Sequence, residues 1–495
     1  PALIDGGSGR TLTYGQLGEL VRRTATGLRT RGFTKGDVFA VWLPNLPEYA
    51  VAFHAVVSLG GVVAPISPLS TPGEMAAQLA AVHARYLLTL PQLLDTAAET
   101  AGHAGVEEVF VLGEASGATP LAALLAHDGP PPEVDIDPRE DVAVLPSSSG
   151  TSGFPKAVML THYNLVANLC QMTAAHCPTE RDTVIGLAPF AHILGMHVVM
   201  NLGLRAGATV VTMARPDFPE FLRLVQEHRV TRADVVPPLV LGLARHPIVD
   251  EFDLSSLEVV MSAAAPLAGD LQEACSKRLG CLVKQAFGTT ETSPATHGNP
   301  DDRARNKPGS IGVLVPRTEA RLVDPGTGTD LGPGQEGELW IRGPQVMKGY
   351  LDNDLATTEC IDREGWLRTG DLCRADEAGY FWVVDRLKEL IKYNGANVAP
   401  AELEALLMTH PAVADVAVVR SPDEEAGEVP KAFVVLREPV SAEDLMDFVA
   451  RRAASHKRIR RVEVIDEIPK APTGKILRRL LVERERSRSS QQLVR

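Results

Sequence analysis

Short apolar runs alternate with helical segments through most of the chain. Val, Ile and Leu dominate each run without a strict apolar–polar alternation, which is typical of strands that are covered on both faces. Ala- and Leu-rich segments of helical periodicity follow the runs. Three such strand and helix pairs are 37–43 with 48–59, 209–213 with 218–228, and 257–261 with 267–279. The pattern predicts an α/β fold built on parallel sheets.

Beyond about residue 309 the pattern changes. Gly and Pro punctuate the apolar runs 317–323, 337–342 and 381–384, which predicts an antiparallel, barrel-like subdomain. We therefore expect a large N-terminal domain, residues 1–387, that contains parallel α/β sheets and this subdomain.

The last part of the chain has a compact pattern of its own. Helices are predicted at 400–410 and 442–454, and strands at 413–419, 431–436 and 461–464. Residues 386–495 hold 20 Lys and Arg against 17 Asp and Glu, although the whole chain carries a formal charge of -13. We predict a small, mobile α+β domain at 388–495 that ends in a frayed polar tail at 484–495.

Composition limits the classes of protein to consider. Residues 49–71 contain no Asp, Glu, Lys or Arg, but a His, a Gly-Gly pair and two Pro within them favour a buried helix and a short strand over membrane insertion. The charge of -13 argues against a nucleic-acid binder. The six Cys are scattered, and the N-terminus lacks a signal-peptide pattern, so we expect reduced thiols and a cytoplasmic protein.

A Ser- and Gly-rich segment follows the predicted strand 142–145. It reads Ser-Ser-Ser-Gly-Thr-Ser-Gly-Phe-Pro-Lys over residues 147–156. Its N–H groups and hydroxyls can surround phosphate oxygens, although the Walker pattern G-x-x-x-x-G-K-[ST] is absent. A plain surface loop is the alternative, because Gly and Ser cluster in loops. The candidate phosphate ligands are Ser148, Ser149, Gly150, Thr151, Ser152 and Lys156.

Five motifs in order along the chain carry a resemblance to a known superfamily. The Ser/Gly-rich segment continues as Val-Met-Leu-Thr-His at 158–162, and Gln-Ala-Phe-Gly-Thr-Thr-Glu stands at 285–291. Thr-Gly-Asp stands at 369–371, Asp-Arg-Leu-Lys-Glu-Leu-Ile-Lys-Tyr at 385–393, and Pro-Thr-Gly-Lys-Ile-Leu-Arg-Arg at 472–479. Together they resemble the motifs of adenylate-forming, or acyl-activating, enzymes. Flanking segments such as 337–344 are most similar to 4-coumarate:CoA ligases and bacterial cinnamate-type ligases.

The resemblance implies a reaction in two steps. A carboxylic acid and ATP give an acyl-adenylate and pyrophosphate, and the thiol of coenzyme A then displaces AMP while the C-terminal domain rotates between the steps. It implies that Lys475 bridges the carboxylate and the α-phosphate, that Lys388 lies at the pivot, and that Lys392 serves thioester formation. Glu291 is implied to hold Mg²⁺, and Thr290 to contact the α-phosphate.

The same resemblance implies the remaining ligand contacts. Phe287 stacks on adenine, while Asp371 and Arg386 bind the ribose hydroxyls. Other nucleotide candidates in that motif are Gln285, Ala286, Gly288 and Thr289. The candidate contacts for coenzyme A are Arg215, Asn394 and Gly395.

Residues 189–195 resemble the segment that forms part of the acid pocket, with His192 at its mouth. Leu194 stands where plant hydroxycinnamate enzymes commonly have Tyr, and Ala263 and Ala286 stand where they usually have Gly. A methyl-sized change is worth about 1–3 kcal/mol of discrimination. We therefore predict an apolar, narrow pocket that prefers unsubstituted cinnamate to its 4-hydroxy and 3-methoxy analogues. The lining candidates are Ile193, Leu194, Ala263, Ala286, Gly288, Pro294 and Ala295.

Three other functions share parts of this pattern. A medium-chain fatty acyl-CoA ligase or luciferase-like enzyme has the same nucleotide motifs. A domain that loads a carrier protein is disfavoured, because the acid-binding segment lacks an aspartate to pair with an α-amino group. A catalytically silent nucleotide-binding protein is disfavoured by Glu291, Asp371, Arg386 and Lys475. The expected partners are a small carboxylic acid, ATP and coenzyme A, with no obligate protein partner.

Overall fold

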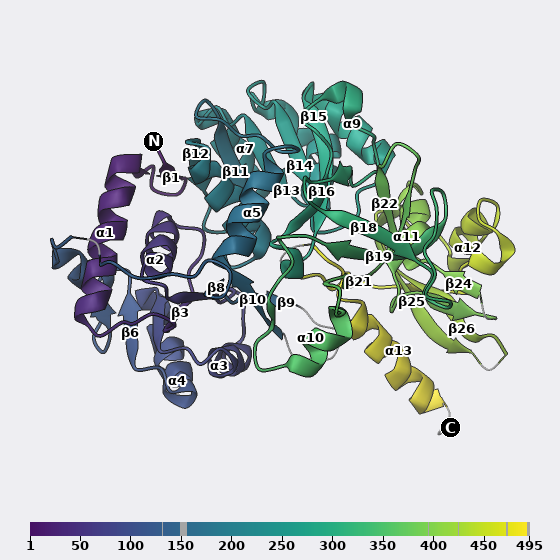
Figure 1. Ribbon diagram of the computed structural model, residues 1–495. Coiled ribbons are helices and arrows are strands. Elements are labelled where there is room, and N and C mark those ends of the chain that lie inside the picture. The colour runs from purple at the N-terminus through teal and green to yellow at the C-terminus, as the bar shows by residue number, and fades with distance from the viewer. Residues whose placement is uncertain (131, 149–155, 395, 424, 472–473, 493–495) are drawn as a thin grey trace. The chain divides into compact units, whose positions relative to one another are not determined.

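The computed structural model describes residues 1–130, 132–148, 156–394, 396–423, 425–471 and 474–492. They form two compact units, which we treat separately. Unit 1 comprises Pro1–Glu319 and Ile341–Leu367, and unit 2 comprises Ala320–Trp340 and Arg368–Arg495. Figure 1 shows helices and sheets in both units, as the α/β pattern predicted. The predicted boundary at 387/388 concerns which part of the chain moves as a body, and it stays a prediction.

Unit 1 contains a mainly parallel sheet in the order β17-β16-β15-β14-β13-β11-β12-β1-β2. Strands β1 and β11 to β15 run parallel, whereas β2, β16 and β17 pair antiparallel with their neighbours. The strands are β1 (Leu3–Asp5), β2 (Thr11–Leu12), β11 (Thr183–Gly186), β12 (Thr209–Thr212), β13 (Arg232–Val235), β14 (Val259–Ser262), β15 (Leu282–Gly288), β16 (Ala295–Gly298) and β17 (Val313–Leu314).

A second sheet of unit 1 has the order β20-β10-β8-β4-β3-β5-β6-β7, with β9 paired to β10. Its strands are β3 (Val38–Val41), β4 (Val62–Pro65), β5 (Tyr86–Thr89), β6 (Glu108–Val111), β7 (Thr119–Pro120), β8 (Val142–Val144), β9 (Ser147–Ser148), β10 (Lys156–Thr161) and β20 (Gly349–Tyr350). Neighbouring strands among β3 to β8 are parallel, whereas β10 pairs antiparallel with both β8 and β20.

Most helices of unit 1 begin at side-chain caps or at Pro in the first turn. Thr13, Thr71 and Thr161 each form a capping box with the residue three positions on. The helices are α1 (Tyr14–Thr30), α2 (Pro47–Ser58), α3 (Pro72–Ala81), α4 (Leu94–Ala104), α5 (His162–Met172), α6 (Gly203–Arg205), α7 (Phe218–Glu227), α8 (Pro237–Arg245), α9 (Gly269–Leu279), α10 (Asp354–Cys360) and the π-helix η3 (Leu194–Leu202). The 3-10 turns are η1 (Pro91–Leu93), η2 (Leu121–Ala126), η4 (Pro247–Glu251), η5 (Thr290–Thr292) and η6 (Arg303–Arg305).

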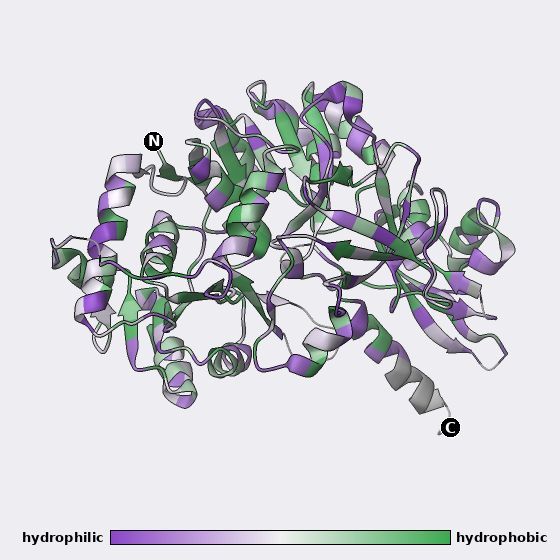
Figure 2. Cartoon of the chain, in the orientation of Figure 1, coloured by the Kyte–Doolittle hydropathy of each residue, from purple (hydrophilic) through white to green (hydrophobic). Residues whose placement is uncertain are grey.

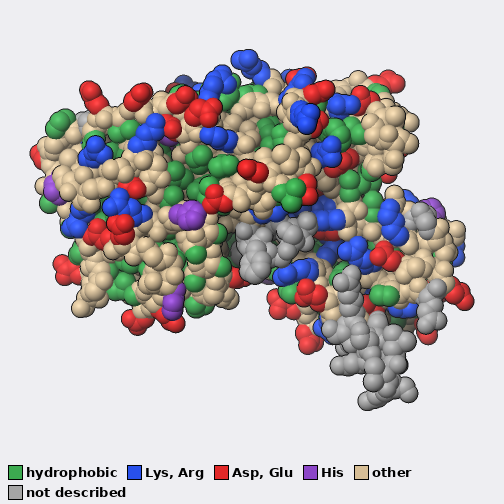
Figure 3. All heavy atoms as spheres, turned by 60° about the horizontal axis from the view of Figure 1, so that its bottom comes forward, with side chains coloured by type: hydrophobic (Ala, Val, Ile, Leu, Met, Phe, Trp, Pro, Cys, Tyr) green, Lys and Arg blue, Asp and Glu red, His purple; other side chains and the backbone are tan. Residues whose placement is uncertain are grey.

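The helix and strand predicted for the uncharged stretch 49–71 are confirmed, because this stretch folds as most of α2 followed by β4. Among the described residues, no helix is both long and apolar enough to cross a membrane. In Figure 2, many strands are coloured as hydrophobic, and most helices mix hydrophobic with hydrophilic residues. Charged side chains of both signs are interspersed on the face drawn in Figure 3.

Helices cover both faces of the parallel sheet of unit 1. Val260 packs with residues of α7, α8 and α9, whereas the next residue, Met261, packs with residues of α5 and η3. Successive strand residues point to opposite faces. The strand ends of β14 and β15 therefore lie beside α5 and η3, and this is the region that the sequence assigns to the acid and the nucleotide.

Unit 2 contains a four-stranded sheet in the order β18-β19-β21-β22 and a second sheet in the order β24-β23-β26-β25, with β27 paired to β26. The strands are β18 (Glu319–Val323), β19 (Glu336–Arg342), β21 (Leu367–Ala375), β22 (Phe381–Arg386), β23 (Ile391–Tyr393), β24 (Ala396–Val398), β25 (Val413–Asp423), β26 (Gly427–Leu436) and β27 (Arg461–Val464). Its helices are α11 (Pro400–Met408), α12 (Ala442–Ala450), η7 (Ser455–Lys457) and α13 (Arg478–Gln492). The small α+β arrangement expected near the C-terminus is confirmed.

The frayed tail expected at 484–495 is wrong for its first part, because α13 continues to Gln492. Glu485 is only 5% exposed, forms an ion pair with Lys431 and accepts a hydrogen bond of 2.6 Å from the Ser421 hydroxyl. Leu481, one turn earlier, is buried in the same unit. The charged composition suggested fraying because the sequence does not show that Lys431 lies opposite Glu485.

Candidate active site

The ends of the Ser/Gly-rich segment are fixed by strand pairing. Ser148 in β9 pairs with Lys156 in β10, and Ser147 pairs with Ala157. Residues 149–155 stand between these strands in the sequence, so the predicted ligands Ser149, Gly150, Thr151 and Ser152 lie outside the described residues. The pairing places the two described ends of the segment side by side.

Lys156 and Glu291 are brought together through a tyrosine. The Lys156 ammonium lies 4.7 Å from the ring centroid of Tyr350, and the Tyr350 hydroxyl donates a 2.9 Å hydrogen bond to Glu291 Oε1. Burial and the nearby Glu291 raise the pKa of Tyr350, so the phenol stays protonated and donates. The sequence analysis did not single out Tyr350, so its hydrogen bond to Glu291 was missed.

The motif at 285–291 forms the end of β15 and the turn η5. The Gln285 side chain is buried and hydrogen-bonded to the backbone of Leu267, so it holds the loop that follows β14. A Cβ at Gly288 would lie 1.8 Å from the carbonyl oxygen of Pro294, so only glycine fits there. Thr289 starts η5 with a capping box to Thr292. Ala286, Phe287, Thr290 and Glu291 remain partly exposed at the end of the strand.

Phe287 packs against a ring of the neighbouring strand, and its stacking on adenine stays a prediction. It pairs with His297 of β16, and the two rings lie 6.0 Å apart at 63°. His297 is fully buried, and burial lowers its pKa to about 3, so it packs as a neutral ring. Phe287 is therefore partly exposed and packs against a buried, neutral ring.

In unit 2, Asp371 and Arg386 form a pair across two strands. They are register partners on β21 and β22, with Arg386 Nε 3.0 Å from Asp371 Oδ1. Asp371 is 2% exposed, and its Oδ2 accepts no hydrogen bond from the described residues. Burial raises the pKa of this carboxyl, and Arg386 and Lys475 partly offset the rise. A buried acceptor of this kind can accept hydrogen bonds from a polar ligand, and the ribose contact that the sequence implied stays a prediction.

Lys475 lies within electrostatic reach of that pair. Burial and then Arg386 lower the pKa of Lys475 to about 8, against the opposing effect of Glu389. Gly474, at a φ of 77°, makes the turn before it, and Ala471 N–H donates to the Lys475 carbonyl at 2.8 Å. Lys388 also acts on the pKa of Lys475. Unit 2 therefore gathers four of the predicted site residues: Asp371, Arg386, Lys388 and Lys475.

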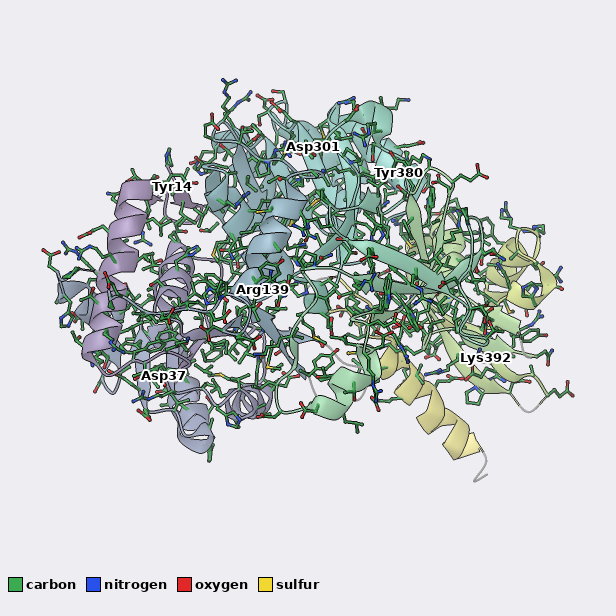
Figure 4. All side chains as sticks on the ribbon, viewed as in Figure 1. Tyr14, Asp37, Arg139, Asp301, Tyr380 and Lys392 are labelled. Atoms are coloured by element: carbon green, nitrogen blue, oxygen red, sulfur yellow. The ribbon has the colours of Figure 1, made fainter. Side chains whose placement is uncertain are left out.

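The predicted contacts for thioester formation are spread over the two units. Lys392, labelled in Figure 4, is exposed on β23, and its ammonium donates to Asn397 Oδ1 at 2.5 Å. Asn394 is exposed next to it, and Gly395 lies outside the described residues. Arg215 is exposed between β12 and α7 of unit 1. Their shared role toward coenzyme A stays a prediction.

Most of the acid-pocket candidates meet in one group of side chains, which we call the apolar cluster. Leu194 and Ala295 are buried in it, and Ala263 and Ala286 pack against it. Its other members come from α5, η3 and β14 and from the chain beside them: Leu169, Met172, Ala188, Val198, Leu202 and Met261. Ile193 belongs to a larger neighbouring core, and Pro294 is buried next to Ala295. These side chains are apolar, and the narrow acid pocket among them stays a prediction.

Two polar side chains fix the margin of the apolar cluster. Asn168 is fully buried and exchanges hydrogen bonds with the Ala295 backbone, at 3.1 Å from Ala295 N and 2.8 Å to Ala295 O. The sequence did not single it out, although an Asn on the apolar face of a helix is a detectable signal. His192 is partly exposed, and its Nδ1 accepts from Leu194 N at 3.2 Å, at the start of η3.

The residues present fit a magnesium ion held with substrate phosphates. Glu291 offers a partly exposed carboxylate close to Lys156 and the described ends of the Ser/Gly-rich segment. Mg²⁺ is commonly held by one or two carboxylates together with phosphate oxygens and water. Within the described ranges, no group of three or more His, Cys, Asp and Glu could hold a metal by itself.

Family models match both parts of the chain. A model described as AMP-binding enzyme matches residues 1–351, and one described as AMP-binding enzyme C-terminal domain matches residues 402–475. The chain belongs to the AMP-binding enzyme family. Within this family, it is 43% identical to "4-coumarate--CoA ligase 5" of Oryza sativa subsp. japonica, over 96% of this chain and 90% of that protein. It is 41% identical to "4-coumarate--CoA ligase 2" of Petroselinum crispum, with the same coverage.

Solved members with the same fold include ATP-bound MatB from Rhodopseudomonas palustris. That structure superposes with a TM-score of 0.89 at 29% identity, over 97% of this chain and 95% of that one. A benzoate CoA ligase from Burkholderia xenovorans LB400 superposes with a TM-score of 0.88 at 28% identity, over 97% and 96%. The superfamily inferred from the five motifs and the fold class inferred from the alternating strands and helices are thereby confirmed.

Proposed function

We infer that this AMP-binding enzyme is an ATP-dependent acyl- or aryl-CoA ligase. It joins a carboxylic acid to ATP as an acyl-adenylate with release of pyrophosphate, and then transfers the acyl group to coenzyme A with release of AMP. It is thus an acid–thiol ligase of the AMP-forming type. Family membership over the whole chain and the likeness to ligases of known structure support this function.

The observation that carries the nucleotide half is the buried Asp371. Its Oδ2 is enclosed without a hydrogen-bond donor among the described residues, and Arg386 lies 3.0 Å from its other oxygen. A buried acceptor left unpaired costs about 1–3 kcal/mol. Two ribose hydroxyls would supply the missing donors, so nucleotide binding recovers that cost.

The chemistry requires positive charge at the attacked phosphate. A carboxylate approaches an anionic triphosphate only if charge is neutralised and the attacking oxygen is aligned. We propose that Lys475 provides the charge in the first step, and that Lys392 replaces it in the second. Glu291 would hold Mg²⁺, which shields the phosphate charge when it is bound. Tyr350 would orient the Glu291 carboxylate.

We propose a cinnamate-like acid as the substrate. Four of the acid-pocket candidates lie in the apolar cluster, and apolar walls favour a flat hydrocarbon ring. The relatives named 4-coumarate–CoA ligases support the same class. Arg215, Asn394 and Gly395 are proposed to contact coenzyme A.

A pyrophosphate-release assay tests the proposal. Aromatic acids of the cinnamate and benzoate types and medium-chain fatty acids are each offered with ATP and Mg²⁺, with and without coenzyme A. We expect the fastest release with a cinnamate-type acid, and formation of its thioester only when coenzyme A is present. Pyrophosphate release with no acid in the panel would overturn the function, and a faster rate with fatty acids would overturn the substrate class.

A further inference from the structure

Unit 1 contains a hollow of about 740 Å³ that is lined by three arginines, Arg139, Arg317 and Arg342. We call it the arginine hollow. Arg139 precedes β8, whereas the Ser/Gly-rich segment follows that strand, so Arg139 and the candidate phosphate ligands belong to opposite ends of β8. Figure 4 labels Arg139 beside the start of α5. The volume lies within the range of small-molecule sites, about 300–1,000 Å³.

An aromatic ring, and not a carboxylate, holds Arg139 in position. Its guanidinium lies 3.8 Å from the ring centroid of Tyr163, in the first turn of α5. The acidic residue next to it, Glu140, pairs with Lys348 instead. Arg139 forms no ion pair within the part of the chain that the structure describes. A guanidinium stacked on a ring is oriented in advance, and its in-plane N–H groups stay available to an anion.

Arg317 is exposed and has a left-handed backbone, with a φ of 59°. A residue other than glycine is strained in this conformation, and such residues cluster at functional sites. The nearest carboxylate in the sequence, Glu319, accepts two hydrogen bonds from Arg342, of 3.0 and 2.7 Å. Among the described residues, Arg317 therefore has no ion pair either.

The charges that line the hollow favour an anionic ligand. Two carboxylates, Glu319 and Glu364, line it together with the three arginines. Both act on the same arginine, because Glu319 and then Glu364 raise the pKa of Arg342. Arg139 and Arg317 remain as two cations without a partner carboxylate. A phosphate monoester carries nearly two negative charges at neutral pH and can engage both guanidinium groups at once.

Hydrogen bonds hold one wall of the hollow in place. Asn164 donates hydrogen bonds of 2.9 Å to the carbonyl oxygens of Pro344 and Val346, which both line the hollow. The buried Gln345 between them donates to the Thr318 hydroxyl at 2.7 Å, in the loop before β18. The apolar lining residues are Pro344, Val346, Met347 and Ile361. A ligand thus meets a preformed apolar wall, which suits a flat ring.

We propose that the arginine hollow binds a phosphate monoester that carries a flat ring, such as a nucleoside monophosphate. The phosphate accepts hydrogen bonds from Arg139 and Arg317, and the ring lies against the apolar wall. This site is additional to the one proposed for ATP, and its ligand takes no part in the ligase reaction. Met347 donates its N–H to the Glu291 carbonyl oxygen at 2.9 Å, so a ligand in the hollow can act on the turn that carries Glu291.

The test counts bound nucleotides by equilibrium dialysis of the full chain against radiolabelled AMP. We expect two AMP per chain in the unchanged protein, one at Asp371 and one in the hollow. Arg139→Gln and Arg317→Gly should each lose the AMP of the hollow, and Asp371→Ala should lose the other. Glycine adopts a left-handed backbone freely, so Arg317→Gly removes the guanidinium without adding strain. Inorganic phosphate should displace the AMP of the hollow, and benzoate should not.

Arg229→Gly is the matched control. Arg229 is also exposed and left-handed, with a φ of 49°, but it pairs with Asp253 at 2.9 Å and does not line the hollow. It should keep both AMP molecules. Should Arg317→Gly not fold, Arg139→Gln, at an exposed position, decides.

Three results would overturn the inference. The first is an unchanged protein that binds no AMP, or binds one that Asp371→Ala abolishes. The second is two AMP per chain in both arginine variants, and the third is displacement by benzoate as readily as by phosphate. A single AMP that survives in Asp371→Ala and is lost in both arginine variants would instead contradict the proposed nucleotide site and support the hollow.

Discussion

The two units hold different groups of the predicted site residues. Unit 1 provides walls and acceptors: the apolar cluster, the ring of Phe287 and the carboxylate of Glu291. Unit 2 provides most of the candidate cations, with Arg386, Lys388 and Lys475 around Asp371. A chain with a formal charge of -13 can thus bind anionic substrates, because it concentrates positive charge in this part of unit 2.

The units also fix their site residues by different means. In unit 1, close backbone packing at Gly288 and neutral hydrogen bonds from Asn168 hold the site residues in place. In unit 2, ion pairs hold the site residues in place. Arg478, which follows Lys475 by three residues, pairs with Glu404 at 2.5 Å and also with Glu389. Ion pairs depend on charge state and backbone fit does not, so pH should affect the function of unit 2 more than that of unit 1.

The largest effect should come from removing one lysine of unit 2 at a time. We expect Lys475→Ala to slow adenylation by at least about a hundredfold, since a charge that acts in the transition state is lost. Thioester formation from preformed acyl-adenylate should be retained. Lys392→Ala should show the reverse. Single-turnover assays of each step, begun with acid and ATP or with the adenylate, measure the two rates separately.

Lys431→Ala is a suitable control for the loss of a lysine in unit 2. Its ammonium pairs with Glu463 and Glu485 and belongs to the fold rather than to the candidate site. It should lower stability and affect both steps equally. Equal loss of both steps in Lys475→Ala and in Lys392→Ala would contradict the division of labour between the two lysines.

The next largest effect should be a pH dependence of adenylation. Burial lowers the pKa of Lys475 to about 8, so its ammonium is present below pH 8 and is lost as the pH rises through that value. We expect kcat/KM for adenylation to fall roughly tenfold per pH unit above that point. Thioester formation should instead rise with pH, because the thiolate of coenzyme A is the nucleophile.

Lys475→Arg provides the check on this assignment. A guanidinium stays charged throughout the accessible range, so the falling limb should disappear even if the rate is lower overall. A falling limb near pH 8 that persists in Lys475→Arg would show that another group is responsible.

The sequence predicted the elements better than it predicted the contacts between them. Apolar runs and helical periodicity located β12, β14 and α11 within a few residues, because periodicity is a local property. The partner of Tyr350 could not be predicted, since Glu291 is far away in the sequence. The tail was mispredicted for the same reason: Lys431 stabilises Glu485 across two elements.

Residues that the backbone geometry requires were easier to predict than apolar pocket residues. Gly288 and Gly474 are demanded by close backbone approach and by a positive φ, so they recur at fixed positions within recognisable segments. Apolar pocket residues lack such a constraint. Ala263 and Ala286 were placed only through the resemblance, and the structure then brought them together in the apolar cluster.

A moderate effect should follow from removing one hydroxyl in unit 1. Tyr350→Phe deletes the donor to Glu291 Oε1 and keeps the ring beneath Lys156. A hydrogen bond to a charged group is worth about 1.5–3 kcal/mol, so adenylation should slow about tenfold or more, and a higher Mg²⁺ concentration should be needed. Tyr49→Phe is the control, because its buried hydroxyl has no hydrogen-bond partner among the described residues. An unchanged Mg²⁺ dependence in Tyr350→Phe would exclude a role in positioning Glu291.

The smallest effect should come from the walls of unit 1. Ala263→Gly and Ala286→Gly each remove a methyl at the margin of the apolar cluster, and a change of this size alters discrimination by about 1–3 kcal/mol. We expect kcat/KM for 3-methoxy-substituted cinnamates to rise relative to cinnamate, with the pH dependence of adenylation unchanged because Lys475 is untouched. Ala188→Gly, at another member of the apolar cluster, tests whether extra space anywhere in it suffices. If all three variants broadened acceptance equally, packing density rather than these two positions would set the selectivity of the walls.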